Sequence, residues 1–140
     1  TVWRVCQPLV DSGISVDTTR MENTWQSLLG LPGFSSFIAG QVVADLRWAM
    51  SGSWSDKDSW APAGPGSQRG LNRLFQRPLN NLYSQRQFLE RLRFVKNEVL
   101  KDCCLHHMEM IDVQSCLCEF DKYERVLHGE GAPRQLYCGV

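Results

Sequence analysis

The feature that most constrains the fold is a Leu-Pro-Gly turn at residues 31–33, which separates two amphipathic segments. Proline cannot continue a helix and glycine favours a turn, so the segment before it must end here. Upstream, residues 19–29 carry apolar side chains at helical spacing, with Asp17 and Thr18 as candidate N-caps. Downstream, a second pattern begins at residues 34–36 and extends to about residue 50. The turn therefore predicts two helices joined by a hairpin.

The rest of the chain also carries helical patterns. Residues 51–70 are rich in Gly, Ser and Pro and are predicted to form a loop, followed by a short helix at 71–75. Longer helices are predicted at 84–102 and at 110–127, the second ended by Gly129, with Val113, Leu117, Phe120, Tyr123 and Leu127 on its inner face. No alternating strand pattern occurs. The prediction is an all-α chain in one domain or fragment: a hairpin region at 17–50, the loop at 51–70 and C-terminal helices at 71–140.

Charge excludes some classes of function. The 140 residues have a net charge of +0, so no overall positive field attracts nucleic acid or membrane. No apolar run reaches the length of a membrane span. The middle of the chain is nevertheless basic, because the stretch from Arg69 to Lys96 contains only one acid, Glu90. This stretch fits either a solvated helix face or a strip that contacts phosphates.

The six cysteines permit two interpretations. An even number in a small chain is compatible with a secreted, disulfide-stapled helical protein. The apolar content favours free cysteines buried as small hydrophobic residues instead. Cys103, Cys104, His106 and His107, followed by Cys116 and Cys118, raise the question of zinc, but their spacing is not that of the usual zinc knuckle. No metal site is assigned.

The Leu-Pro-Gly turn is compatible with a DNA-binding helix-hairpin-helix. In such a hairpin, backbone amides near Gly33, Phe34 and Ser35 would hold a DNA phosphate at the start of the second helix. Ser35 stands where a second glycine is usual, so half of the pattern is missing. The segment "AGPGSQRG" could likewise cradle a phosphate through Gly64, Gly66 and Ser67, with Arg69 neutralising its charge. An ordinary Gly-Pro turn is the alternative.

Three segments together resemble a known family. The segments are "LPGFSSFIAGQVVADLR", "DSWAPAGPGSQRGLNRL" and "MIDVQSCLCEFDKYERVLHGEG". They are similar to the helical proteins of DNA base hypermodification, namely the 5-hydroxymethyl-deoxyuridine DNA kinases and glutamyl/putrescinyl thymine pyrophosphorylase-like proteins, which resemble helix-hairpin-helix DNA glycosylases. The resemblance implies a glycosylase-like helical fold that lacks most of the helices normally preceding the hairpin. The chain is therefore expected to be incomplete on its N-terminal side, or to work with a partner chain.

The resemblance also implies roles for particular residues. Asp58 matches the position of the glycosylase active-site acid and is expected to accept a proton from the base hydroxyl. Glu119 or Asp121 would hold a metal ion, and Arg69 and Lys122 would pair with phosphates. Further positions match the family without an assigned role: Asp45, Asp112, Gln114 and Tyr123. Asp58 and the 64–69 segment are expected to lie within side-chain reach of Glu119 and Lys122.

The implied activity is phosphoryl transfer to the hydroxymethyl group of 5-hydroxymethyluracil in DNA, with a nucleotide triphosphate and Mg²⁺ as cofactors. DNA is the implied partner, no membrane is expected, and the implied location is intracellular, either nuclear or cytoplasmic. Two alternatives remain open at this point. One is a glycosylase-like DNA-binding module without catalysis, and the other is the secreted disulfide-stapled protein.

Overall fold

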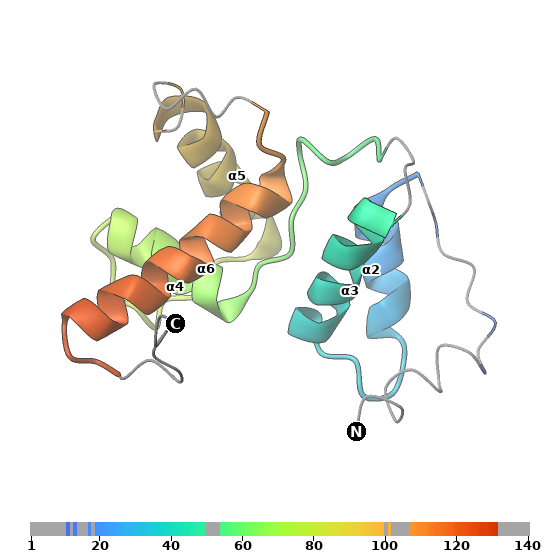
Figure 1. The fold of residues 1–140 in the computed structure, drawn as a ribbon, viewed down its shortest axis with the longest axis horizontal. Coiled ribbons are helices and arrows are strands. Elements are labelled where there is room, and N and C mark those ends of the chain that lie inside the picture. The colour runs from blue at the N-terminus through green and yellow to red at the C-terminus, as the bar shows by residue number, and fades with distance from the viewer. Residues whose placement is uncertain are drawn as a thin grey trace, which may run out of the picture.

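The computed structural model describes residues 11, 13, 17, 19–49, 54–99, 101 and 107–131. In this part of the chain the fold is helical, as predicted. The elements are α2 (Met21–Leu29), α3 (Ser36–Ala49), α4 (Pro65–Leu74), α5 (Gln85–Phe94), a π-helical turn η1 (Val95–Val99) and α6 (Met110–Leu127). Helices α2 and α3 lie together on one side of the molecule, and α4, α5 and α6 form the other side (Figure 1).

Each side has its own hydrophobic core. The α2–α3 core also receives the indole rings of Trp54 and Trp60, which follow α3 in the chain. The second core is built from α4, α5, η1 and α6, and its fully buried members include Leu71, Phe88, Leu92 and Met110. Leu89 packs against both cores. The two cores are therefore adjacent but formed from different helices.

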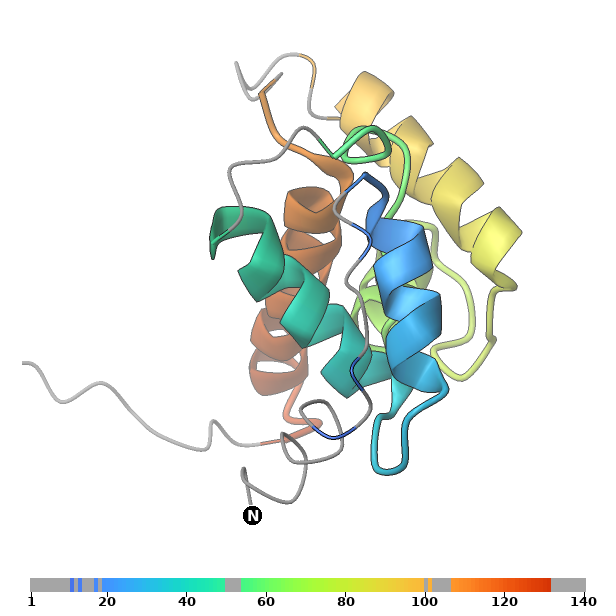
Figure 2. The ribbon, with the colours of Figure 1, turned by 90° about the vertical axis from the view of Figure 1, so that its right-hand side faces the viewer.

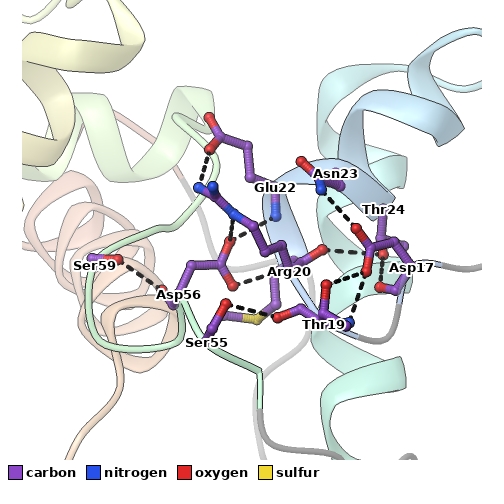
Figure 3. Close-up of polar contacts among 10 residues, drawn as sticks. Asp17, Thr19, Arg20, Glu22, Asn23, Thr24, Ser55, Asp56 and Ser59 are labelled. Carbon is purple, nitrogen blue, oxygen red and sulfur yellow. Dashed lines mark hydrogen bonds and ion pairs between the residues drawn. The ribbon is translucent and has the colours of Figure 1, made fainter.

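A distant aspartate caps the first helix. The carboxylate of Asp56 accepts hydrogen bonds from the backbone N–H groups of Met21 at 2.9 Å and Glu22 at 3.0 Å (Figure 3). These amides have no partner within the helix, so a buried carboxylate is a favourable cap. The predicted cap at Asp17 is wrong, because α2 begins at Met21 and the Asp17 carboxylate instead accepts from Thr19 and Asn23. Thr18 lies outside the described residues.

The predicted hairpin between the first two helices is present. Gly33 has a φ of 87°, which is a left-handed conformation that glycine adopts without strain. The next residue, Phe34, is buried in the α2–α3 core, and its N–H donates to the carbonyl of Leu31. The Ser35 hydroxyl accepts from the N–H of Ile38 at 3.2 Å, so this residue helps to start α3. Helix α3 keeps the predicted bounds to within a residue.

The second half differs from prediction at two places. Helix α4 already begins at Pro65, so the predicted 51–70 loop ends early and the short 71–75 helix is the end of a longer one. Proline at the first helical position and glycine before it are a favourable helix start. The predicted 84–102 helix starts at a capping box on Ser84 but changes to a π-helical turn at Val95.

Helix α6 has the predicted bounds, and Gly129 follows it with a φ of 67°. Its buried face was only partly predicted. Val113 and Leu117 are buried, but Tyr123 and Leu127 are exposed, and Asp121 is fully buried. The buried residues of α6 are therefore mainly apolar up to Leu117, and the next buried residue toward the C-terminal end is the acid Asp121.

A few contacts tie the two halves together. In the view from the α2–α3 side, α3 lies in front of α6 (Figure 2). The Arg47 guanidinium near the end of α3 pairs with Glu109 at 3.0 Å and with Asp112 at 2.8 Å at the start of α6. A Cβ on Gly40 would lie 2.9 Å from the Pro62 ring, so glycine permits close contact there. Among the described residues, no helix is long and apolar enough to serve as a membrane span.

Candidate functional site

A cavity of about 330 Å³ lies where α3, α4 and α6 meet, and we call it the α3–α4–α6 cavity. Its volume falls in the range typical of small-molecule sites. It is lined by Phe37, Gln41, Gly64, Pro65, Gly66, Arg69, Gln114, Ser115, Cys118, Glu119, Asp121, Lys122 and Arg125. The structure thus brings together seven of the predicted site residues: Gly64, Gly66, Arg69, Gln114, Glu119, Asp121 and Lys122.

Glycines let α4 lie directly against α6 beside this cavity. A Cβ on Gly70 would lie 2.3 Å from the carbonyl oxygen of Leu117, which is sterically impossible without a shift of the backbone. A Cβ on Gly66 would meet the Cys118 sulfur at 3.2 Å, and one on Gly64 would meet the Gln114 amide at 3.1 Å. The glycines of "AGPGSQRG" are therefore explained by close helix packing. The segment forms the first turns of α4 rather than a loop, and its phosphate-binding role stays a prediction.

Two arginines on successive turns of α4 share one buried carboxylate. Asp121 has no exposed surface, and its Oδ2 accepts from the Nε of Arg69 at 2.8 Å. Its Oδ1 accepts from the Nε of Arg73 at 3.0 Å. Burial of an unpaired carboxylate is costly, so the arginines compensate its charge. Both oxygens are occupied, and Asp121 is therefore not available to hold the metal ion predicted for it.

The other charged residues at the cavity are exposed. Lys122 donates to Glu119 at 2.6 Å, with 66% and 70% of the two side chains exposed. An ion pair this exposed contributes little to stability and separates easily. Arg125 also lines the cavity. The rim therefore carries three cations, Arg69, Lys122 and Arg125, and one exposed carboxylate, Glu119.

Aromatic and amide groups face the same space. Phe37, in the first turn of α3, lines the cavity although 53% of the residue is exposed. Gln41 lies one turn further along α3. Gln114 is buried on α6, and its amide nitrogen donates to the Ser67 hydroxyl at 3.2 Å. Ser67 itself is buried and donates to the carbonyl of Gly64, so it supports the wall rather than lining the cavity.

One wall of the cavity contains the thiol of Cys118. Burial raises the pKa of the Cys118 thiol above its ordinary value, and hydrogen bonds from Ser67 only partly offset this. Burial, together with the nearby Asp112 carboxylate, also raises the pKa of Cys116. Both thiols are free, but Cys116 is exposed rather than buried as predicted. The other cysteines, Cys6, Cys103, Cys104 and Cys138, lie outside the described residues. His106 also lies outside them, so the structure does not test zinc binding by this group of residues.

Other predicted site residues lie elsewhere. Asp58 pairs with Lys96 of η1 at 2.6 Å and is not part of the cavity lining. Asp112 pairs with Arg47 and caps the start of α6 through the N–H of Glu109. Asp45 and Tyr123 are exposed on α3 and α6. The structure therefore does not join Asp58 to Glu119 in one cleft.

The basic stretch from Arg69 to Lys96 is largely paired within the molecule. Arg86 pairs with Glu90, and Lys96 pairs with Asp58. Arg77 and Arg91 lie over the rings of Tyr83 and Phe75. Most of the stretch is therefore a folded surface, and Arg69 is its only member in the cavity lining. Among the described residues, no three His, Cys, Asp or Glu side chains gather closely enough to hold a metal ion.

Six residues of the cavity lining were not among the predicted site residues: Phe37, Gln41, Pro65, Ser115, Cys118 and Arg125. Phe37 and Gln41 lie one helical turn apart on α3, and the apolar periodicity of this helix is typical of a core-packing role for Phe37. The position of Phe37 just after the hairpin is one feature of the sequence that could have indicated a ligand-binding role, because a side chain there is close to any ligand held by the hairpin. Arg125 lies one turn beyond Asp121 on α6, and this spacing in the sequence is typical of a surface ion pair rather than of a binding site.

Comparison with known proteins gives one finding on the family. The model of the 5-hmdU DNA kinase helical domain matches residues 13–132. This range includes every helix described above and the whole lining of the cavity. No curated protein and no solved structure shows a significant match to the chain.

Proposed function

Because the chain belongs to the family of 5-hmdU DNA kinase helical domains, we propose that it acts in the modification of 5-hydroxymethyluracil in DNA and that the α3–α4–α6 cavity receives the target nucleotide. The family sets the class of substrate, and the cavity offers a place for it. An intracellular location follows from this substrate and is part of the proposal.

One observation carries the proposal: a single cavity joins an aromatic ring, primary amides and cations. An enzyme that acts on a base in DNA must take the base out of the stack and hold it in a pocket. Stacking on an aromatic ring and hydrogen bonds to the base edge are the usual contacts. Phe37 supplies the ring, and the amides of Gln41 and Gln114 can both donate and accept. A volume of about 330 Å³ is adequate for one nucleotide.

The hairpin lies directly before the ring. Gly33 is exposed, and no atom lies within 4 Å of the position that a Cβ would occupy there. A DNA backbone can therefore approach this turn closely. Because α3 starts at Ser36 and Phe37 follows, a strand held at the hairpin would place the next base beside the cavity. In this arrangement the hairpin positions DNA without reading its sequence.

Glu119 is the carboxylate best placed to accept the proton of the base hydroxymethyl group. It lines the cavity and is exposed, whereas Asp121 is buried between two arginines and Asp58 pairs with Lys96. A general base must lie within hydrogen-bond reach of the proton that it removes. The described residues do not fit a Mg²⁺ site, because Glu119 is the cavity's only carboxylate that is not held by arginines. The family implies a nucleotide triphosphate as phosphoryl donor.

The test is binding of 5-hydroxymethyl-2′-deoxyuridine and of a short single-stranded oligonucleotide that contains it, measured by calorimetry and fluorescence anisotropy. Phe37→Ala should weaken both by about tenfold or more, because base stacking on an aromatic ring is lost. Trp48→Ala is the matched control: Trp48 is exposed on the same helix but outside the cavity lining. Equal effects of the two variants, or no binding by the wild type, would contradict the proposal.

A further inference from the structure

The geometry points to a phosphate subsite inside the α3–α4–α6 cavity, made by the terminal nitrogens of Arg69 and oriented by the buried carboxylate of Asp121. The inference deepens the proposed function and rests on it, because it names the group of the nucleotide that this wall of the cavity binds. The subsite would take a phosphate of the DNA backbone or a phosphate of a free nucleotide.

The two arginines that share Asp121 differ in what their outer nitrogens do. Arg73 donates through Nε to Asp121, and its Nη1 and Nη2 both reach Glu130, so all of its donor groups face acids. Only 9% of its side chain is exposed. Arg69 donates through Nε alone, to Asp121, and 37% of its side chain is exposed. Among the described residues, the Nη atoms of Arg69 have no hydrogen-bond partner.

Within the described part of the chain, therefore, only Arg69 of the two arginines has Nη donors that remain available to bind a ligand. A guanidinium presents its donors in a rigid fork, so a bond at Nε sets the plane and direction of the other nitrogens. Asp121 is fully buried and itself immobilised by two arginines, which makes it a firm anchor for that bond. The outer edge of Arg69 is thereby held toward the cavity that it lines. Such an edge matches two oxygens of a phosphate.

Charge at the cavity favours an anion as the ligand. Asp121 is compensated by Arg69 and Arg73 together, and Glu130 adds a second acid that pairs with Arg73 and also interacts electrostatically with Arg125. The link to Glu130 also raises the pKa of Arg73, so this arginine stays charged. Lys122 and Arg125 lie on the same rim as Arg69, and the one exposed acid there is Glu119. Arg69 is the cation whose orientation is built into the fold, so we assign the phosphate to it.

The role of Asp121 is to position Arg69 and not to contact the ligand. This role predicts that positive charge at residue 69 is insufficient without the fork. Arg69→Lys keeps the charge but loses both the bidentate edge and the planar Nε bond to Asp121. If the subsite attracted phosphate only through its positive charge, Arg69→Lys would leave phosphate binding unchanged.

The experiment compares wild type, Arg69→Gln, Arg69→Lys and Arg86→Gln, with thermal melting to confirm folding. Arg86 is the control because it is a highly exposed arginine that pairs only with Glu90, away from the cavity. The probes are the nucleoside 5-hydroxymethyl-2′-deoxyuridine, the oligonucleotide that contains it, and ATP. Affinity for the oligonucleotide is measured over a range of salt concentrations.

Both Arg69 variants should bind one phosphate-bearing probe at least about tenfold more weakly, while nucleoside binding and the Arg86→Gln control stay unchanged. A loss for the oligonucleotide, with a salt slope smaller by about 0.7, assigns the subsite to the DNA backbone. A loss for ATP alone assigns it to a free nucleotide. Unchanged binding of both probes, or wild-type behaviour of Arg69→Lys, overturns the subsite. The nucleoside arm then still reports on the proposed function, because it contains no phosphate.

Should both Arg69 variants melt early, a second measurement replaces them. The Nε–H resonance of Arg69 in wild-type protein is followed by NMR during titration with inorganic phosphate. Asp121→Asn, if folded, should remove the response of this resonance although Arg69 is still present. A resonance that does not move in wild type overturns the inference, and a response that survives Asp121→Asn overturns the positioning role.

Discussion

Asp56 and Met21 are 35 residues apart in the chain, yet the carboxylate of one accepts the first free N–H of the helix that begins at the other. The contact is 2.9 Å long and buried. It fixes the start of α2 against the segment that leads from the first core to the second.

Asp56→Ala should lower the free energy of unfolding by about 1–3 kcal/mol, because two helix amides lose their acceptor in a buried place. Urea denaturation followed by circular dichroism measures this change. Asp45→Ala, which removes an exposed aspartate from α3, is the control and should have little effect. Equal stability of the two variants would show that water replaces the Asp56 cap.

Gly70→Ala should destabilise the protein by about 1–3 kcal/mol, because its Cβ would lie 2.3 Å from the Leu117 carbonyl oxygen and would force α4 away from α6. The sign of the change is the informative part. In an uncrowded helix position, alanine would be more stable than glycine by up to about 1 kcal/mol. Thermal melting measures the change, and Gly30→Ala, with its nearest contact at 3.4 Å, is the uncrowded control.

Gly33→Val should weaken binding to DNA of every sequence, because valine does not adopt the φ of 87° found at the hairpin. Gly33→Asn separates two causes, since asparagine tolerates this backbone conformation but still adds a side chain. If close approach of DNA matters, both variants bind less tightly in an anisotropy assay. Unchanged affinity in a folded Gly33→Val protein would show that the hairpin is only a connection between helices.

Glu119→Gln should reduce ATP-dependent phosphate labelling of 5-hydroxymethyluracil DNA by about a hundredfold or more, since a proton acceptor at the cavity is lost. The side chain is exposed, so the fold should be unaffected. Asp58→Asn removes only the exposed end of the pair with Lys96 and should retain most of the activity. Loss of labelling with Asp58→Asn alone would return the catalytic role to the residue expected from the family resemblance. Absence of labelling in wild type would favour a DNA-binding module without catalysis.

Cys118 should react slowly with iodoacetamide near pH 7, because burial raises its thiol pKa, and it should react more slowly than Cys116, because Cys116 is exposed to the reagent. The thiolate is the reactive form, so raising the pH toward and above the ordinary thiol value should speed the reaction. Bound 5-hydroxymethyl-2′-deoxyuridine should protect Cys118 but not Cys116, as peptide mass mapping can show. Equal protection of both would place the ligand outside the cavity.

Local patterns were sufficient to predict the helices but not the partners of their charged groups. The bounds of α6 follow from its apolar period and Gly129, and the hairpin follows from Pro32 and Gly33. Asp56 could not be assigned as a cap, because its acceptor role depends on a contact with a helix 35 residues earlier. The start of α4 was not predicted, because Gly64, Gly66 and Gly70 are typical of a loop, whereas in the structure all three permit close contact with α6.

The site was predicted in part for a similar reason. Arg69, Glu119 and Lys122 were chosen as a group from the family resemblance, and the structure does place them around one cavity. Asp58 was predicted from its match to the position of the glycosylase active-site acid, and a match in sequence does not determine which way the side chain faces. Asp121 was predicted as a metal ligand because an aspartate commonly has that role, but in the structure its carboxylate pairs with Arg69 and Arg73. Residue type alone does not indicate these partners.

The division of the apolar residues into two cores has a consequence for how this chain loses its structure. Phe37 belongs to the helix of one core, while Arg69 and Glu119 belong to helices of the other. A nucleotide that touched all three would connect the halves as Leu89 and the Arg47 pairs do. Its binding energy would then resist separation of the halves, so a titration with ligand should merge any two-step melting curve into one cooperative transition.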